Sequence, residues 1–140
     1  MTKSTRQIAG LYQNLTVISE FVTNWAQTCQ FGERAVYAVQ MAVDEACSNI
    51  IEHAYGGEGK GDITLICKKV DGGLKMTIKD KGTPFDPTIV AAPNINAPLE
   101  ERDNGGLGLF LMKQLMDEVS FTFDKKWNTL VMIKKQEPTL

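Results

Sequence analysis

The sequence lacks the features that mark several large classes of protein. It has no long basic run and a net charge of −2, which argues against nucleic acid as a direct partner. Its apolar runs, such as residues 107–112, are far too short to span a bilayer, and the N-terminus has no signal-peptide pattern. With 140 residues, the chain is long enough for one domain, residues 1–140, built around a single core.

Cysteine and histidine are also scarce. The three cysteines, Cys29, Cys47 and Cys67, are odd in number, widely spaced and set in apolar segments. This pattern predicts reduced, buried thiols in a cytoplasmic protein rather than a disulfide framework or a zinc site. His53 is the only histidine. We expect a packing or hydrogen-bonding role for it, in preference to a transition-metal site or a catalytic base.

Residues 33–55 show the apolar spacing of an amphipathic helix. Glu45 falls almost opposite the apolar stripe, and Asn49 and His53 follow it at four-residue intervals in one row. Three neighbouring alanines at 38, 42 and 46 are small enough to leave room for a ligand. The alternative is that alanine is simply the best helix former and that Glu45 is a solvated acid. The helix alone does not decide between the two.

The remaining elements predict an α+β fold. Residues 6–11 suggest an edge strand, and a helix capped by Asn14 or Thr16 follows and ends at Gly32. A hairpin is predicted over 62–70 and 74–80 around an Asp-Gly turn, and two further strands over 119–123 and 129–134. This order suggests an antiparallel or mixed sheet with helices on one face, a two-layer α/β sandwich.

Between the hairpin and the last strands lies a long irregular segment with four of the five prolines. A loop of this length in a compact domain is usually functional or disordered. It leads into Gly105, Gly106 and Gly108, which precede a predicted helix. Glycines before a helix N-terminus suit phosphate binding, although the same pattern also makes a tight turn.

A carboxylate and a glycine follow the second strand of the hairpin. Asp80 can accept a hydrogen bond from an exocyclic amine, and Gly82 allows close approach to a flat ring. The alternative for Asp80 is a solvent-facing turn acid. A nucleotide is the ligand that would use all these parts, because Asn49 could place an oxygen on Mg²⁺ and Glu45 could orient or deprotonate a nucleophile.

Three motifs in this order resemble those of the GHKL-type ATPases. The N box corresponds to Glu45-x-x-x-Asn49-x-x-x-His53-Ala-Tyr55, the G1 box to Asp80-x-Gly82-x-Pro84-Phe-Asp-Pro87, and the G2 box to Gly105-Gly-Leu-Gly108-Leu-Phe-Leu. The variants with His-Ala-Tyr and Pro-Phe-Asp-Pro are similar to the anti-sigma factor serine-protein kinases. The resemblance covers nearly the whole chain.

The resemblance implies a Bergerat (GHKL) ATP-binding fold, with ATP and Mg²⁺ as ligands and residues 87–104 as the ATP lid. It implies that Glu45 is the general base, that Asn49 is the Mg²⁺ ligand, and that Asp80 binds the adenine amine, with Thr129 holding it through water. In that family the phosphate acceptor is a serine on a STAS-type anti-anti-sigma partner. The same protein binds a sigma factor, usually as a homodimer.

Two functions remain open at this point. The first is an ATP-dependent protein-serine kinase that doubles as a binding switch. The second is a non-catalytic, nucleotide-gated module that only sequesters its partner. Glu45 discriminates between them, because a pure binder has no need of a carboxylate beside the metal site. A sensor histidine kinase domain fits less well, since Pro84 stands where those kinases usually have glycine.

Overall fold

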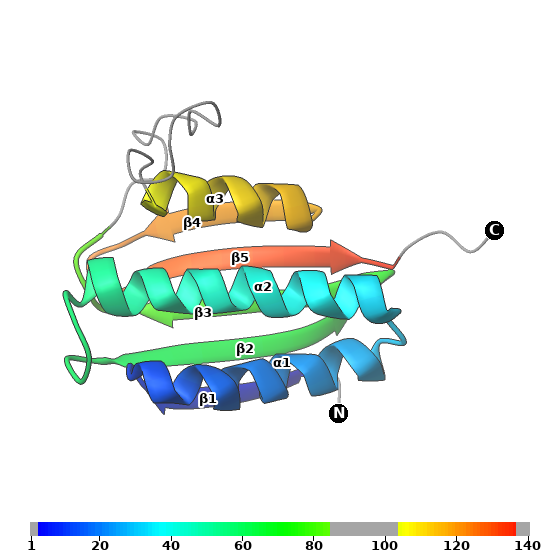
Figure 1. Ribbon diagram of the computed structural model, residues 1–140, viewed down its shortest axis with the longest axis horizontal. Coiled ribbons are helices and arrows are strands. Elements are labelled where there is room, and N and C mark those ends of the chain that lie inside the picture. The colour runs from blue at the N-terminus through cyan, green and yellow to red at the C-terminus, as the bar shows by residue number, and fades with distance from the viewer. Residues whose placement is uncertain (1–2, 85–103, 137–140) are drawn as a thin grey trace.

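The computed structural model describes residues 3–84 and 104–136, with residues 104–108 as backbone only. Three helices cover one face of a five-stranded antiparallel sheet (Figure 1). This confirms the predicted α+β two-layer sandwich. The elements are β1 (Lys3–Ala9), η1 (Tyr12–Asn14), α1 (Leu15–Thr28), α2 (Glu33–Asn49), η2 (Ile50–Ala54), β2 (Asp62–Val70), β3 (Gly73–Asp80), α3 (Asn104–Leu115), β4 (Glu118–Phe123) and β5 (Asn128–Lys135). The predicted lid, residues 87–104, lies outside the described residues except for Asn104.

The strand order is β1-β2-β3-β5-β4, so β3 is the central strand. The predicted β2–β3 hairpin is confirmed, and Gly72 in its turn has a φ of +75°, where glycine is favoured. The predicted first strand is also confirmed at the sheet edge, although β1 begins and ends earlier than residues 6–11. Asp80 therefore ends the central strand, where it pairs with Asn128, the first residue of β5.

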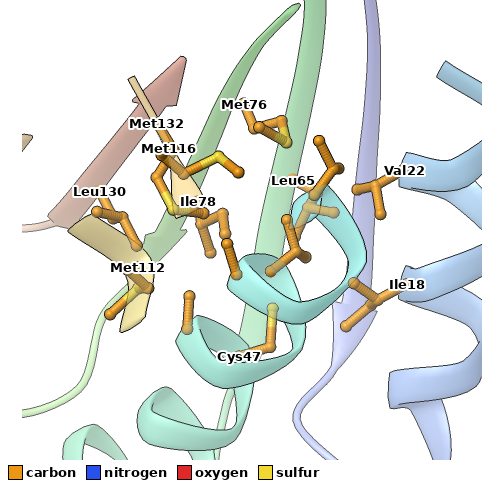
Figure 2. Close-up of a cluster of buried hydrophobic side chains, with 14 of the residues drawn as sticks. Ile18, Val22, Cys47, Leu65, Met76, Ile78, Met112, Met116, Leu130 and Met132 are labelled. Carbon is orange, nitrogen blue, oxygen red and sulfur yellow. The ribbon is translucent and has the colours of Figure 1, made fainter. Parts of the chain in front are cut away.

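The core lies between the helices and the inner face of the sheet. Figure 2 shows side chains of all three helices meeting this face, with Cys47 of α2 between Ile18 of α1 and Met112 of α3. All three cysteines are buried and free, as predicted. Among the described residues, no helix is both long enough and apolar enough to cross a membrane.

The junction between α1 and α2 differs from the prediction. Gln30, with a φ of 62°, takes the left-handed position, and Phe31 N–H donates to the Ala26 carbonyl at 3.1 Å. This is a Schellman ending in which glutamine occupies the place usually held by glycine. Gly32 is instead the N-cap residue of α2. Asn14 makes no side-chain cap, because its amide donates to the Ala9 carbonyl at 2.9 Å.

The long helix also ends differently. It is α-helical only to Asn49, and residues 50–54 form a π-helical turn, in which Tyr55 N–H donates to the Ile50 carbonyl at 2.9 Å. A π-turn contains more residues than an α-turn, so the regular α-helical repeat predicted from Glu45 through Asn49 to His53 is interrupted after Asn49. Such turns are frequent at functional sites.

Tyr55 fastens the end of this turn to the sheet. Its hydroxyl donates to the backbone carbonyl of Asp62 at 2.6 Å and accepts from the backbone N–H of Lys81 at 3.0 Å. One of these residues begins β2 and the other follows β3, so a single phenol bridges the two strands at one end of the sheet. Burial of the ring raises the pKa of Tyr55.

We predict that Tyr55→Phe lowers the free energy of unfolding by about 1–2 kcal/mol, because it removes a hydroxyl that makes two backbone hydrogen bonds. Urea unfolding followed by circular dichroism measures this loss. Tyr37→Phe is the matched control, since Tyr37 is 60% exposed and should unfold like the wild type. Equal stability of the two variants would contradict the bridging role.

Candidate active site

A pocket opens between the C-terminal end of α2, η2, α3 and the inner face of the sheet. It brings together Asn49 and Asp80, two of the residues singled out from the sequence, and it is bordered by Thr129. Most of its lining is apolar: Ala46, Ile50, Ala54, Leu109, Met112, Phe121, Phe123 and Leu130, with His53, Thr83 and Asn128 as further polar members. Figure 2 shows two of these apolar residues, Met112 of α3 and Leu130 of β5, at one edge of the buried cluster. An apolar pocket with a few convergent polar groups is typical of a small-molecule site.

Asp80 is the charged group of this pocket and is only 5% exposed. Its Oδ1 accepts hydrogen bonds from Gly82 N–H at 2.9 Å and from Asn128 Nδ2 at 2.8 Å. Burial raises the pKa of Asp80, and the two hydrogen bonds oppose this shift. The solvent-facing alternative is thus wrong, and the pocket holds a desolvated carboxylate that gains from a further donor.

The sheet register separates Thr129 from Asp80. Asp80 pairs with Asn128, and Thr129 pairs with Lys79. Cross-strand partners share a face, and successive residues alternate. The Thr129 side chain therefore lies on the face of Lys79, and Asn128 is the β5 residue that contacts Asp80. Sequence reasoning missed Asn128 because it stands next to a turn, where asparagine is common.

Gly82 serves the packing of the loop after β3. A Cβ at this position would lie 2.5 Å from the carbonyl carbon and oxygen of Ala54, in η2. The next residue, Thr83, donates its N–H to that same carbonyl oxygen at 2.7 Å. The glycine thus permits contact between the loop and the π-turn. Its predicted contact with a flat ring stays a prediction.

Glu45 lies one turn before Asn49, partly buried and outside the residues that line the pocket. Desolvation raises the pKa of Glu45, and the nearby charges of Asp44 and Glu52 raise it further. Of the three alanines expected to leave room for a ligand, only Ala46 lines the pocket. Ala38 and Ala42 are buried in the core, so this expectation was wrong for them.

The three glycines expected to precede a helix lie inside one. Helix α3 begins at Asn104, so Gly105, Gly106 and Gly108 belong to its first turns. They remain near a helix N-terminus, where backbone N–H groups have no partner within the helix. Their contact with phosphate stays a prediction.

With this geometry in place, comparison with known proteins identifies the family. Residues 8–134 match the family described as a histidine kinase-like ATPase domain. The chain belongs to this family.

The similar proteins within this ATPase family include serine-protein kinases. The serine-protein kinase RsbW of Bacillus cereus is 34% identical over 97 residues, and that of Listeria monocytogenes is 33% identical over 104 residues. These matches cover 66% and 71% of the chain but only 60% and 66% of the relatives' own lengths.

A solved structure shows the same fold. It contains the RsbU and RsbW domains of a Mycobacterium tuberculosis protein and superposes with a TM-score of 0.69 at 14% identity. The superposition covers 96% of the chain and 32% of that structure. At this identity the likeness is one of fold.

We predict that Gly82→Ala destabilises the nucleotide-free protein by about 1–3 kcal/mol, because the added methyl group meets the Ala54 backbone. Thermal unfolding without ligand measures the loss. Gly32→Ala is the control, because a Cβ there meets no atom within 4 Å, and we expect it to cost less than about 1 kcal/mol. If both variants unfolded alike, Gly82 would not be required for this packing.

We also predict that Asp80→Asn leaves the nucleotide-free protein at least as stable as the wild type at pH 7. Because burial raises the folded pKa of Asp80, the unfolded chain loses this proton first as the pH rises. The free energy of unfolding therefore falls as the pH rises from the unfolded pKa of about 3.9 to the raised folded pKa. Above the folded pKa the full cost of ionisation applies. The amide avoids that cost, so its advantage should shrink as the pH falls to about 4.

Thermal unfolding at both pH values tests this prediction. Asp71→Asn is the control, because Asn-Gly suits the same exposed hairpin turn and should leave stability unchanged. A melting temperature for Asp80→Asn clearly below the wild type at pH 7 would show that the ionised carboxylate stabilises the empty pocket.

Proposed function

We propose that the protein is an ATP-dependent protein-serine kinase that phosphorylates a serine of a STAS-type anti-anti-sigma partner. It also binds a sigma factor, as a homodimer. The observation that carries the proposal is the desolvated carboxylate of Asp80 in an apolar pocket, with the Asn49 amide on the same lining. The family match and the serine-protein kinases among the relatives support it.

The pocket suits an adenine nucleotide. Its apolar lining fits the faces of a flat base, and the buried carboxylate of Asp80 offers an acceptor for an exocyclic amino group. A guanine or uracil carbonyl at the same place would leave that carboxylate without a donor. We therefore assign Asp80 to the adenine amine.

The donor set also fits Mg²⁺. Within the described residues, no cluster of three or more histidine, cysteine or acidic side chains could form a metal cage. Magnesium in nucleotide sites needs none, because it keeps several waters and takes one or two protein oxygens together with phosphate oxygens. The Asn49 side-chain oxygen would supply a protein ligand of this kind, and the N-terminus of α3 would hold phosphate.

When bound, Mg-ATP supplies the phosphoryl group and the metal charge that stabilises its transfer. The chain's own task is to position the acceptor serine and to take its hydroxyl proton. Glu45 can accept that proton, and its raised pKa makes it a stronger base than an exposed glutamate. Partial burial also limits its contact with water.

We predict that Glu45→Gln keeps ATP affinity near the wild-type value and lowers phosphorylation of a STAS serine by about 10²–10⁴-fold, the usual contribution of a general base. Incubation with [γ-³²P]ATP and the partner measures the transfer, and calorimetry measures the binding. Glu33→Gln is the control, because it makes the same change about 18 Å away along α2.

Two results would count against these assignments. A fully active Glu45→Gln variant would remove Glu45 as the base while leaving the kinase in place. Wild-type protein that binds ATP and the partner, yet transfers no phosphate to it, would instead establish a nucleotide-gated binding module.

A further inference from the structure

Asn128 and Asp80 are the two buried polar side chains among the described residues, and they contact each other. Asn128 is 8% exposed and opens β5, where asparagine is disfavoured and a β-branched residue would fit the strand better. A buried amide is also costly unless it is hydrogen bonded. The position therefore calls for an explanation beyond strand formation.

The contacts of Asn128 fix the orientation of its amide. Nδ2 donates to Asp80 Oδ1 at 2.8 Å and to the Gly82 carbonyl at 2.9 Å. Both partners are acceptors, so the NH₂ group must face them, and both of its protons are used. The amide thereby joins the end of β3, the loop after it and the start of β5.

This arrangement makes the two oxygens of Asp80 unequal. Gly82 N–H donates to Oδ1 as well, so both donors recorded among the described residues meet the same oxygen. These two donors together hold the carboxylate group in one orientation. Oδ2 is then the oxygen left for a ligand in the pocket that Asp80 and Asn128 both line.

We propose that Asn128 is a positioning residue that determines base specificity, because it holds Oδ1 of Asp80 and presents Oδ2 to a 6-amino purine. A 6-oxo purine would set its carbonyl oxygen against the carboxylate and leave it without a donor, an arrangement that proteins reject strongly. Without Asn128 the carboxylate could rotate or take up a proton and then tolerate the oxo group. This inference rests on the proposed adenine-nucleotide pocket.

The test compares ADP with IDP, which differ at the 6-position of the base. Calorimetry should show that the wild type prefers ADP. In Asn128→Ala the ratio of the two affinities should fall about tenfold or more, the equivalent of one hydrogen bond to a charged group. An NMR titration of the Asp80 carboxyl in the nucleotide-free variant should show a pKa above that of the wild type, since a hydrogen bond that lowers it is lost.

Two further variants separate positioning from general damage. Thr77→Val is the matched control, because Thr77 lies on β3, pairs with Val131 and does not line the pocket, so it should keep the wild-type ADP-to-IDP ratio. Asn128→Thr keeps one hydroxyl donor in a residue that suits a strand, so it should show an intermediate ratio. If Asn128→Ala does not fold, the ADP-to-IDP ratio of Asn128→Thr tests the inference in its place.

The outcomes are distinct. If the Asn128 variants weaken ADP and IDP equally and keep the ratio, Asn128 is merely structural and the inference is wrong, while the adenine pocket stands. If the wild type binds ADP no better than IDP, or binds neither, the proposed function fails first. A reduced ratio together with a raised Asp80 pKa supports the inference.

Discussion

The rest of the site depends on one buried carboxylate. Asp80 ends the central strand inside an apolar pocket, where its charge loses the solvation of water. Its two hydrogen-bond donors come from separate parts of the fold: Gly82 is held against Ala54 of η2, and Asn128 is placed by the β3–β5 register. The π-turn, the loop after β3 and the first residue of β5 therefore form one unit around a single charge.

Helix α2 contributes to both the core and the pocket that holds Asp80. Its inner alanines and Cys47 pack in the core, which lets neighbouring helices approach closely, while Asn49, at its C-terminal end, lies on the pocket. The π-turn follows at once and interrupts the α-helical repeat, and after it Ala54 contacts the loop after β3 and Tyr55 contacts the sheet. The segment His53-Ala54-Tyr55 thus has a structural role beyond the histidine: Ala54 accepts from Thr83, and Tyr55 bridges β2 and β3.

Sequence reasoning reached the fold because the hairpins and long helices have strong periodic patterns and turn signals. It also brought Asn49 and Asp80 to one pocket. It missed Asn128, where a one-residue difference decides which side chain contacts Asp80. Asn128 and Thr129 are adjacent, and only the register of β5 against β3 shows which of them faces Asp80. The same limit applies to Gln30, because a glycine two residues later was the more obvious helix end, and to the π-turn, which has no sequence signature. Local propensity is weak at such places, and tertiary contacts select the conformation.

The two ends of helix α3 differ in composition. Leu109 and Met112 are buried and line the pocket, and Met116 just beyond the helix is buried too. The first five residues include three glycines, each of which costs about 1 kcal/mol relative to alanine in a helix interior. The helix is therefore stabilised mainly by its later residues, and its first turns are held by little intrinsic propensity. The glycines therefore lie at the positive end of the helix dipole, and Leu109 and Met112, further along the helix, form part of the pocket wall.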